Sequence, residues 1–278
     1  METELDLLGL PDVSRVVLKH APLVLALCQV RFTSMLSVND PASLAAFQRA
    51  IQHRYPIGIP VQEVEVLFGI GPNSPGIRQE QRRSPQLQFT DQNDNWKVVL
   101  SPDFLTLETR NYEHFDDFLA RLQESLDALV ECIHPTIVTR LGLRYINEIR
   151  SRDLHKINWR DIIRQDLLGP IAVPELVENT TQVIAVQQLL LRYPKDVGVN
   201  IHYGLVPTGT TVRLRPKEEQ PTQPFYLLDY DVFREFPLPG ALIMDTEAIC
   251  KYVKVYHKMI YRLFRWSVSE QYISTLQE

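Results

Sequence analysis

Glycine is scarce in this chain, and its scarcity excludes whole classes of function. Only 11 of the 278 residues are glycine, and none of them cluster where a strand would turn into a helix. The sequence contains no Gly-x-Gly-x-x-Gly or Walker-type phosphate loop, and no His-Glu-x-x-His, Gly-x-Ser-x-Gly or Cys-x-x-Cys motif. We therefore expect no dehydrogenase or NTPase chemistry, assign no residue a catalytic role, and predict no cofactor.

Cysteine and long apolar runs are also lacking. The three cysteines, Cys28, Cys132 and Cys250, stand alone, so no pair has the spacing of a disulfide framework or a zinc site. The most apolar stretch, residues 23–28, is far shorter than the roughly 20 residues that cross a bilayer. The acidic first six residues precede no apolar run and do not resemble a signal peptide. We predict a cytoplasmic protein with no metal site and no membrane contact.

Charge and size set the remaining bounds. The formal net charge is −5, which disfavours a general phosphate-binding surface and hence nucleic acid as the main partner. With 278 residues, of which 45% are hydrophobic, the chain can bury a substantial core, as one large domain or two modest ones.

Apolar periodicity predicts the same order of elements in two halves, residues 1–135 and 136–278. In the first half we expect strands at 23–32, near 63–69, and at 86–90, 96–100 and 105–109, with helices at 41–54, capped by Asn39 or Asp40, and at 115–133. In the second half we expect strands at 136–149, 181–193, 197–206 and 225–233, with helices at 159–165 and, capped by Asp245, at 246–265. A capping box, Ser267-Val-Ser-Glu270, is expected to begin a last short helix.

Each half thus approximates β-α-β-β-β-α. The pattern predicts an α+β fold of two similar, closely packed halves, each a largely antiparallel sheet covered by a long helix. An internal duplication and convergent packing both explain such an order, and the alternative to two separate units is that the closely packed halves form one structural unit.

The strand at 136–149 carries the most specific signal, because its two faces differ. Ile137, Leu141, Leu143, Tyr145 and Ile149 alternate with Arg140, Gly142, Arg144 and Glu148. A strand with one apolar face and one arginine-bearing face is expected at the centre of a sheet whose second face has a polar role.

The motif Thr-Arg-Leu-Gly-Leu-Arg-Tyr-Ile-Asn at 139–147 resembles the signature of a sporadically distributed prokaryotic protein family of unknown function. Other features that fit this family are the strand after Ala21-Pro22, Tyr55-Pro56 after the first helix, the strand pair within 96–112, and Tyr256-His257 with Phe264 in the closing helix. No catalytic residues are established for that family, so the resemblance implies none here. Its patchy distribution points to mobile or defence-related operons.

The arginine face is the first candidate site. Arg140 and Arg144 would lie about 13 Å apart along one strand face. Arg31 would join them if the first strand pairs alongside. The planar guanidinium group suits carboxylate or phosphate, so this face, with Glu148 at its far end, would hold an anionic ligand or a partner. The competing interpretation is a structural network in which Glu108, Glu148 or another carboxylate neutralises the arginines.

Two further sets of charges suggest other functions. Contacts to a partner or to phosphates would come from a loop bearing Arg78, Arg82 and Arg83, and from one helical face bearing Lys251, Lys254, Lys258, Arg262 and Arg265. The helix at 115–133 has an acidic face, which suggests that the two helices complement each other within the molecule or across a homodimer. A solvated surface explains each charged stripe equally well.

Asp229 and Asp231 are two residues apart on a predicted strand, so both carboxylates face one way and would suit Mg²⁺ in a metal-dependent hydrolase. Such pairs are common by chance, and no histidine or lysine has the spacing that completes the site. The preferred function is therefore a non-enzymatic binding or accessory protein that engages a partner protein or an anionic ligand through the arginine face. A nucleic-acid-binding protein and a metal-dependent hydrolase are the alternatives.

Overall fold

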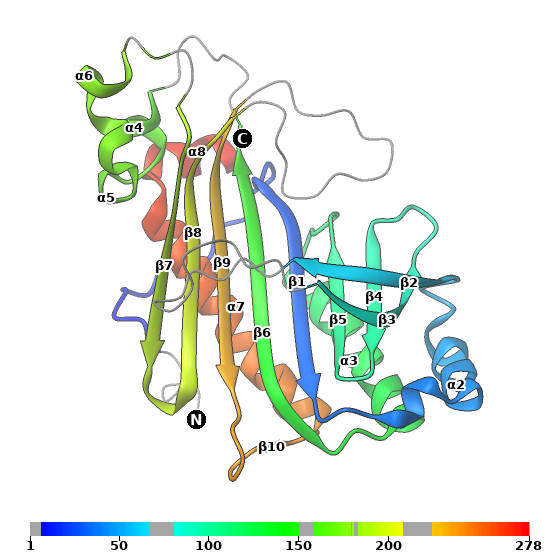
Figure 1. The fold of residues 1–278 in the computed structure, drawn as a ribbon. Helices are drawn as coiled ribbons and strands as arrows, with labels where there is room; N and C mark the ends of the chain where they lie inside the picture. Colours follow the sequence, from blue (N-terminus) through cyan, green and yellow to red (C-terminus); the bar gives the residue numbers. More distant parts are fainter. Residues whose placement is uncertain are drawn as a thin grey trace.

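The computed structural model of the chain describes residues 7–66, 81–150, 158–178, 180, 183–207 and 224–277. Its strands form one ten-stranded antiparallel sheet (Figure 1). The strands are β1 (Leu23–Phe32), β2 (Ile57–Val66), β3 (Gln81–Thr90), β4 (Trp96–Ser101), β5 (Phe104–Thr109), β6 (Ile137–Ile149), β7 (Ala185–Tyr193), β8 (Val197–Val206), β9 (Phe225–Glu235) and β10 (Leu242–Ile243). Their order across the sheet is β2-β3-β4-β5-β1-β6-β9-β8-β7, and the short β10 pairs with β6.

The helices include all those that the periodicity predicts, although the one expected at 159–165 ends at Ile162, and two separate short helices follow it. They are α2 (Pro41–Ile51), α3 (Phe115–Ile133), α4 (Trp159–Ile162), α5 (Gln165–Leu168), α6 (Pro174–Val177), α7 (Thr246–Ser267) and α8 (Glu270–Gln277), with 3-10 turns η1 (Leu36–Asn39), η2 (Gly169–Ala172) and η3 (Pro194–Asp196). Asp40 caps α2 by accepting from the backbone N–H of Ser43 (2.9 Å), and Asp245 caps α7 through that of Ala248 (2.6 Å). A side-chain cap satisfies a backbone donor that the first turn of a helix leaves unpaired.

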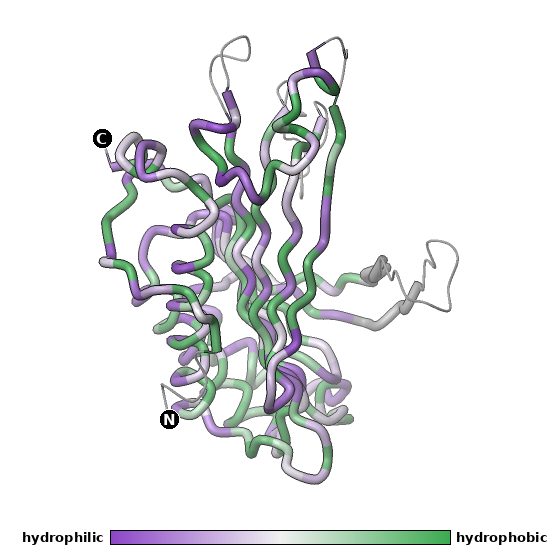
Figure 2. The backbone as a smooth tube through the Cα atoms, turned by 90° about the vertical axis from the view of Figure 1, so that its left-hand side faces the viewer, coloured by the Kyte–Doolittle hydropathy of each residue, from purple (hydrophilic) through white to green (hydrophobic). Residues whose placement is uncertain are grey.

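The long helices α3 and α7 pack on one face of the sheet, which we call the helix face (Figure 1). The main hydrophobic core lies between these two helices and the sheet, because every second residue of the central strands points toward the helices. These residues are Ala26, Cys28 and Val30 of β1 and Leu141, Leu143 and Tyr145 of β6. The opposite face, which carries Arg140 and Arg144, is the front face. Seen edge on, the sheet has these helices on one side, and the hairpin of β2 and β3 projects from the other (Figure 2).

The two predicted halves meet at the centre of this single sheet, where β1 pairs antiparallel with β6. In each half the first strand also pairs with the last strand of the meander that follows it: β1 pairs with β5, and β6 with β9. The observed class is therefore mixed helix and strand around a large antiparallel sheet, and the core continues from one half into the other.

Several predicted boundaries change. Helix α2 ends at Ile51 rather than residue 54, and β2 begins at Ile57, six residues before the predicted strand, whose residues 67–69 lie outside the described residues. The capping box at Ser267 is wrong, because Ser267 is the last residue of α7 and its hydroxyl donates to Leu263 O (2.8 Å). The hydroxyl that accepts from the first turn of α8 belongs to Ser269, which contacts Tyr272 N (3.1 Å). Within the described ranges, no helix is long and apolar enough to span a membrane.

Candidate functional site

A band of polar side chains, bonded to one another in pairs and small clusters, crosses the front face from β4 to β7. We call it the polar band. It comprises Lys97, Glu108, Thr106, Gln29, Arg31, Arg140, Arg144, Asp229, Asp231, His202, Asn200 and Gln188. The strand pairings bring these residues together, because residues opposite each other in an antiparallel pair point to the same face.

The strongest contact in the band joins β6 to β9. Arg144 donates to both carboxylate oxygens of Asp229, from Nε to Oδ1 (2.8 Å) and from Nη2 to Oδ2 (2.6 Å). His202 Nδ1, on β8, lies 3.3 Å from Asp229 Oδ2. The side chain of Asp229 is only 4% exposed, whereas that of Arg144 is 37% exposed. A bidentate pair between a guanidinium group and a buried carboxylate is the strong form of this interaction.

Arg140 makes the neighbouring pair and explains the glycine in the motif. Its Nη2 donates to Asp231 Oδ2 (2.9 Å), and its guanidinium carbon lies 4.6 Å from the ring centroid of Phe233. A Cβ atom on Gly142 would come within 2.9 Å of Arg140 Nη1. Glycine at position 142 therefore leaves room for the Arg140 side chain to lie across the strand.

The pKa values of the two aspartates, Asp229 and Asp231, are shifted in opposite directions. Burial alone would raise the pKa of Asp229, but hydrogen bonds and charge from Arg144 and His202 together outweigh it and lower that pKa below its usual 3.8. For Asp231, burial is the largest cause and prevails over the attraction of Arg140 and Arg144, so its pKa is raised. The carboxylate of Asp229 is the one that the surroundings stabilise in its charged form.

This difference predicts opposite effects of pH on two asparagine variants. Because the pKa of Asp229 is lowered in the folded state, Asp229 stabilises the fold above pH 3.8, and this stability is lost as the pH falls through the folded-state pKa. Because the pKa of Asp231 is raised in the folded state, Asp231 destabilises the fold as the pH rises from 3.8 through its folded-state pKa. Relative to wild type, Asp229→Asn should therefore lose stability as the pH rises across the window just below 3.8. Relative to wild type, Asp231→Asn should gain stability as the pH rises across the window just above 3.8.

Urea unfolding from pH 3 to pH 7 measures both profiles. At pH 7 we expect Asp229→Asn to lower the free energy of unfolding by about 2 kcal/mol, because a buried hydrogen-bonded charge is lost. Asp231→Asn should stay within about 1 kcal/mol of wild type, since Arg140 keeps its contact with Phe233 and its access to water. Equal losses with parallel pH profiles in the two variants would contradict this assignment.

The other predicted residues of the arginine face have their own partners. Arg31 lies opposite Arg140 in the β1–β6 register and donates from Nε to Gln29 Oε1 (2.8 Å). Glu148 is buried and accepts from Arg150 Nη2 (2.5 Å), while Glu108 pairs with Lys97 Nζ (3.2 Å). The carboxylates that pair with Arg140 and Arg144 are thus Asp231 and Asp229 rather than Glu108 or Glu148.

Those aspartates are also the predicted Mg²⁺ ligands. They do share a face, but both carboxylates are already paired with arginine. Across the described ranges, no group of three or more His, Cys, Asp and Glu side chains is arranged to hold a metal ion.

The predicted basic surface is divided. Arg78 lies outside the described residues, and Arg82 and Arg83 belong to the part of β3 of which only the backbone is described. On α7, Lys251, Lys254 and Lys258 are exposed, and Lys251 pairs with Glu247 (2.7 Å). Arg262 is buried and bonds to Asp12 (3.0 Å). Arg265 bonds to Glu270 (2.8 Å) and to Ser14 O (3.2 Å).

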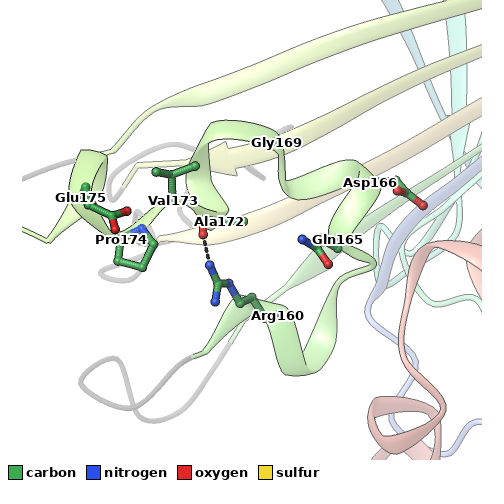
Figure 3. Close-up of a pocket in the computed structure, with 8 residues that line it drawn as sticks. All are labelled: Arg160, Gln165, Asp166, Gly169, Ala172, Val173, Pro174 and Glu175. Atoms are coloured by element: carbon green, nitrogen blue, oxygen red, sulfur yellow. Dashed lines mark hydrogen bonds between the residues drawn. The ribbon is translucent and has the colours of Figure 1, made fainter.

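An open hollow of about 680 Å³ lies among the short helices α4 to α6 and η2, and none of its lining residues belongs to the polar band (Figure 3). Arg160 donates to the backbone carbonyl of Ala172 across it. The hollow is lined mainly by turn residues and exposed side chains: Gln165, Asp166, Gly169, Val173, Pro174 and Glu175. It offers no buried polar group that would fix the orientation of a ligand.

Sequence reasoning found the arginines of the band and expected His202 to be a packing and hydrogen-bonding residue, but it did not place His202 in the band and missed Asn200 and Gln188. Gln188 Nε2 donates to Asn200 Oδ1 (2.9 Å) and extends the band to β7. The available signal was the alternation of polar residues at 198–202 with apolar ones, which places Asn200 and His202 on one face of β8.

Comparison with known proteins adds no assignment: no protein-family model matches this chain, and no curated protein matches it.

Proposed function

We propose that this chain is a binding protein without catalytic chemistry of its own, and that it engages a partner protein through the polar band and the adjoining edge strand β7. The observation that carries the proposal is that β7 is an edge strand with exposed aliphatic side chains. Among the described residues this strand pairs only with β8, and it exposes Val186, Leu189 and Leu190. Ile184, just before it, is 63% exposed.

An edge strand of this kind is a template for another strand. Its outer N–H and C=O groups can pair with an added strand, and soluble proteins commonly protect such edges with charges, proline or bulges. Residues 185–193 contain no proline and a single charged residue, Arg192. The partner segment that fits is an extended strand with aliphatic side chains, which adds to β7 by main-chain hydrogen bonds.

The charges of the polar band favour a protein over a free anion. Arg140 and Arg144 are each neutralised by an aspartate, so the front face does not present an excess of positive charge at that point. It presents both signs, together with amide groups at Gln188 and Asn200. Such a surface complements a polypeptide and would set its register, while the aliphatic edge supplies most of the contact area.

The origin of the fold belongs to the same proposal. Pairing of β1 with β5 and of β6 with β9 supports two related halves, and the motif at 139–147 supports membership of the sporadically distributed prokaryotic family. A cytoplasmic partner is the kind that such a protein would meet.

Neither alternative gains support of this kind. A nucleic-acid surface would need a continuous basic stripe, but Arg262 and Arg265 are bonded to residues 8–14 and to α8. A hydrolytic metal site would need the carboxylates of Asp229 and Asp231, which are bonded to Arg144 and Arg140.

Native mass spectrometry of the protein purified at low salt from its own host tests the proposal. We expect wild type to carry a bound partner protein and the variant Leu189→Lys/Leu190→Lys to lose it, because two charges on the edge oppose strand addition. The matched control is Ile57→Lys/Ile59→Lys, which places the same charges at comparably exposed aliphatic positions on the opposite edge strand β2, and should keep the partner.

Three outcomes would contradict the proposal: wild type free of any protein, wild type bound only to nucleic acid, or loss of the partner in both double variants. A wild-type homodimer that dissociates only in the β7 variant would identify the occupant of the edge as a second copy of this chain instead.

A further inference from the structure

A pocket of about 410 Å³ lies on the helix face, on the other side of the sheet from the polar band. The segment at 15–23 forms one wall, and the start of α3, the strand β6 and the helix α7 form the others. The segment is held in place by α7: Tyr261 Oη accepts from Val16 N (3.0 Å) and donates to Ser14 O (3.3 Å). The volume is in the lower part of the range of about 300–1,000 Å³ that is typical of small-molecule sites.

Three pocket residues form a hydrogen-bonded chain. Tyr145 Oη lies 3.1 Å from His257 Nδ1 and 3.2 Å from Tyr112 Oη. The His257 ring stacks on Phe115 with a centroid separation of 3.9 Å. Burial, with a smaller contribution from the charge of Arg15, lowers the pKa of His257 to about 4, and burial raises the pKa of Tyr112 to about 12. All three groups are therefore neutral near pH 7.

When Tyr112, Tyr145 and His257 are all neutral, their hydrogen-bonded chain leaves one N–H or O–H donor unused. If His257 Nδ1 carries the proton, it donates to Tyr145, Tyr145 donates to Tyr112, and the Tyr112 hydroxyl proton is left over. If Nε2 carries the proton, Tyr112 donates to Tyr145, Tyr145 donates to Nδ1, and the Nε2–H is left over. Either tautomer offers one hydrogen-bond donor at a residue that lines the pocket.

The pocket also contains an acceptor and a cation. Asn147 is 5% exposed and donates from Nδ2 to Leu228 O (3.1 Å), while its Oδ1 receives no hydrogen bond from the described residues. Arg15 is exposed at the pocket and has no hydrogen bond or ion pair with any described residue. Lys19 and Glu113 line the pocket as well, and Asn111 Nδ2 already donates to the Glu113 carboxylate (3.2 Å).

The walls combine aromatic with aliphatic side chains. Tyr112, Phe115, Tyr145, His257, Tyr261 and Phe264 all contribute to the lining. Flat rings pack well in such a site, because aromatic pairs bury a large area in offset or tilted arrangements.

We propose that this pocket binds a small, flat aromatic carboxylate that carries a hydrogen-bond donor on its ring system. Arg15 pairs with the carboxylate at the mouth, and the Tyr112–Tyr145–His257 chain donates a hydrogen bond to the same carboxylate. Asn147 Oδ1 accepts from the ring donor, and the aromatic side chains enclose the ring. The site does not depend on the proposed partner, since it lies on the other face of the sheet.

Indole-3-acetate is the probe, with two matched analogues. Indole-3-acetamide lacks the negative charge, and 1-benzothiophene-3-acetate lacks the ring N–H. The readout is the His257 Cε1–H resonance in a carbon–proton NMR titration of the full chain; it is one of seven histidine signals and is identified as the one absent from His257→Gln. We expect this resonance to move saturably with indole-3-acetate, and each analogue to bind about tenfold more weakly.

Arg15→Gln removes the cation at an exposed position and should not affect folding. Arg15→Gln should weaken the binding of indole-3-acetate about tenfold and leave the binding of indole-3-acetamide unchanged. Arg49→Gln, an exposed arginine on α2 away from the pocket, should bind indole-3-acetate as wild type does. The proposal is overturned if the His257 resonance does not move, if the acid and the amide bind equally, or if Arg15→Gln binds the acid as tightly as wild type.

Discussion

Replacing Arg144 with alanine is expected to lower the free energy of unfolding by about 3 kcal/mol at pH 7, because it leaves a buried carboxylate without its main partner. Asp229 is 4% exposed and accepts two hydrogen bonds from this one side chain. Breaking a buried ion pair from one side typically costs about 3–5 kcal/mol. The low end applies here, because His202 also contacts Asp229 and Arg144 itself reaches solvent.

The double variant Arg144→Ala/Asp229→Asn separates the pair from the individual side chains. Removing both charges should cost less than the sum of the two single losses, since no uncompensated charge stays buried. The matched control is Arg192→Ala, whose partner Glu235 is half exposed, and which should change the free energy of unfolding by at most about 1 kcal/mol. Urea unfolding measures all four variants, including Asp229→Asn, against wild type. A loss below about 0.5 kcal/mol for Arg144→Ala would show that the pair is not structural.

This prediction decides between the two interpretations of the arginine face. If a residue contacts only a partner, replacing it should abolish binding and leave the stability of the protein unchanged. The bidentate contact with Asp229 instead makes Arg144 part of the sheet, so loss of binding in Arg144→Ala would not by itself locate the interface. The exposed positions Leu189 and Leu190 are better probes, because they bear no hydrogen-bonded charge.

The elements of this fold were predictable because they depend on neighbours in the chain. Alternation at 23–32 and helical spacing at 115–133 gave β1 and α3 with their observed bounds, and Asp40 and Asp245 were expected as caps. The side-chain period also placed Arg140, Gly142 and Arg144 on one face. These properties need only the geometry of a strand or a helix.

The partners of those residues could not be predicted, because they depend on strand register between distant segments. Asp229 is 85 residues from Arg144, and a shift of one residue in the β6–β9 register would turn it to the other face. Nearby glutamates were the natural expectation from the sequence. The helix-side pocket was missed for a related reason: Tyr145 was assigned to the apolar face, and its hydroxyl meets His257, 112 residues away.

The largest effect of a single methyl group is expected at Gly204, in the strand β8 that pairs with β7. Gly204 has φ +138°, a conformation that other residues rarely adopt, and it lies opposite Val186 in the β7–β8 register. A Cβ atom there would come within 1.7 Å of the backbone oxygen of Ala185. No side-chain rotation relieves a contact with backbone, so the strands must separate.

We expect Gly204→Ala to lower the free energy of unfolding by more than about 3 kcal/mol, from the strained backbone together with the lost pairing at the start of β7. Gly9→Ala is the matched control, since nothing lies within 4 Å of its Cβ position, and it should stay within about 0.5 kcal/mol of wild type. Hydrogen exchange of the β7 amides should rise in Gly204→Ala well before that of β1 and β6. If both variants unfold like wild type, β7 is not held by this close approach. A large loss confined to Gly204→Ala would instead show that this close approach holds β7 in place, and under the proposed function that variant should also lose its bound partner.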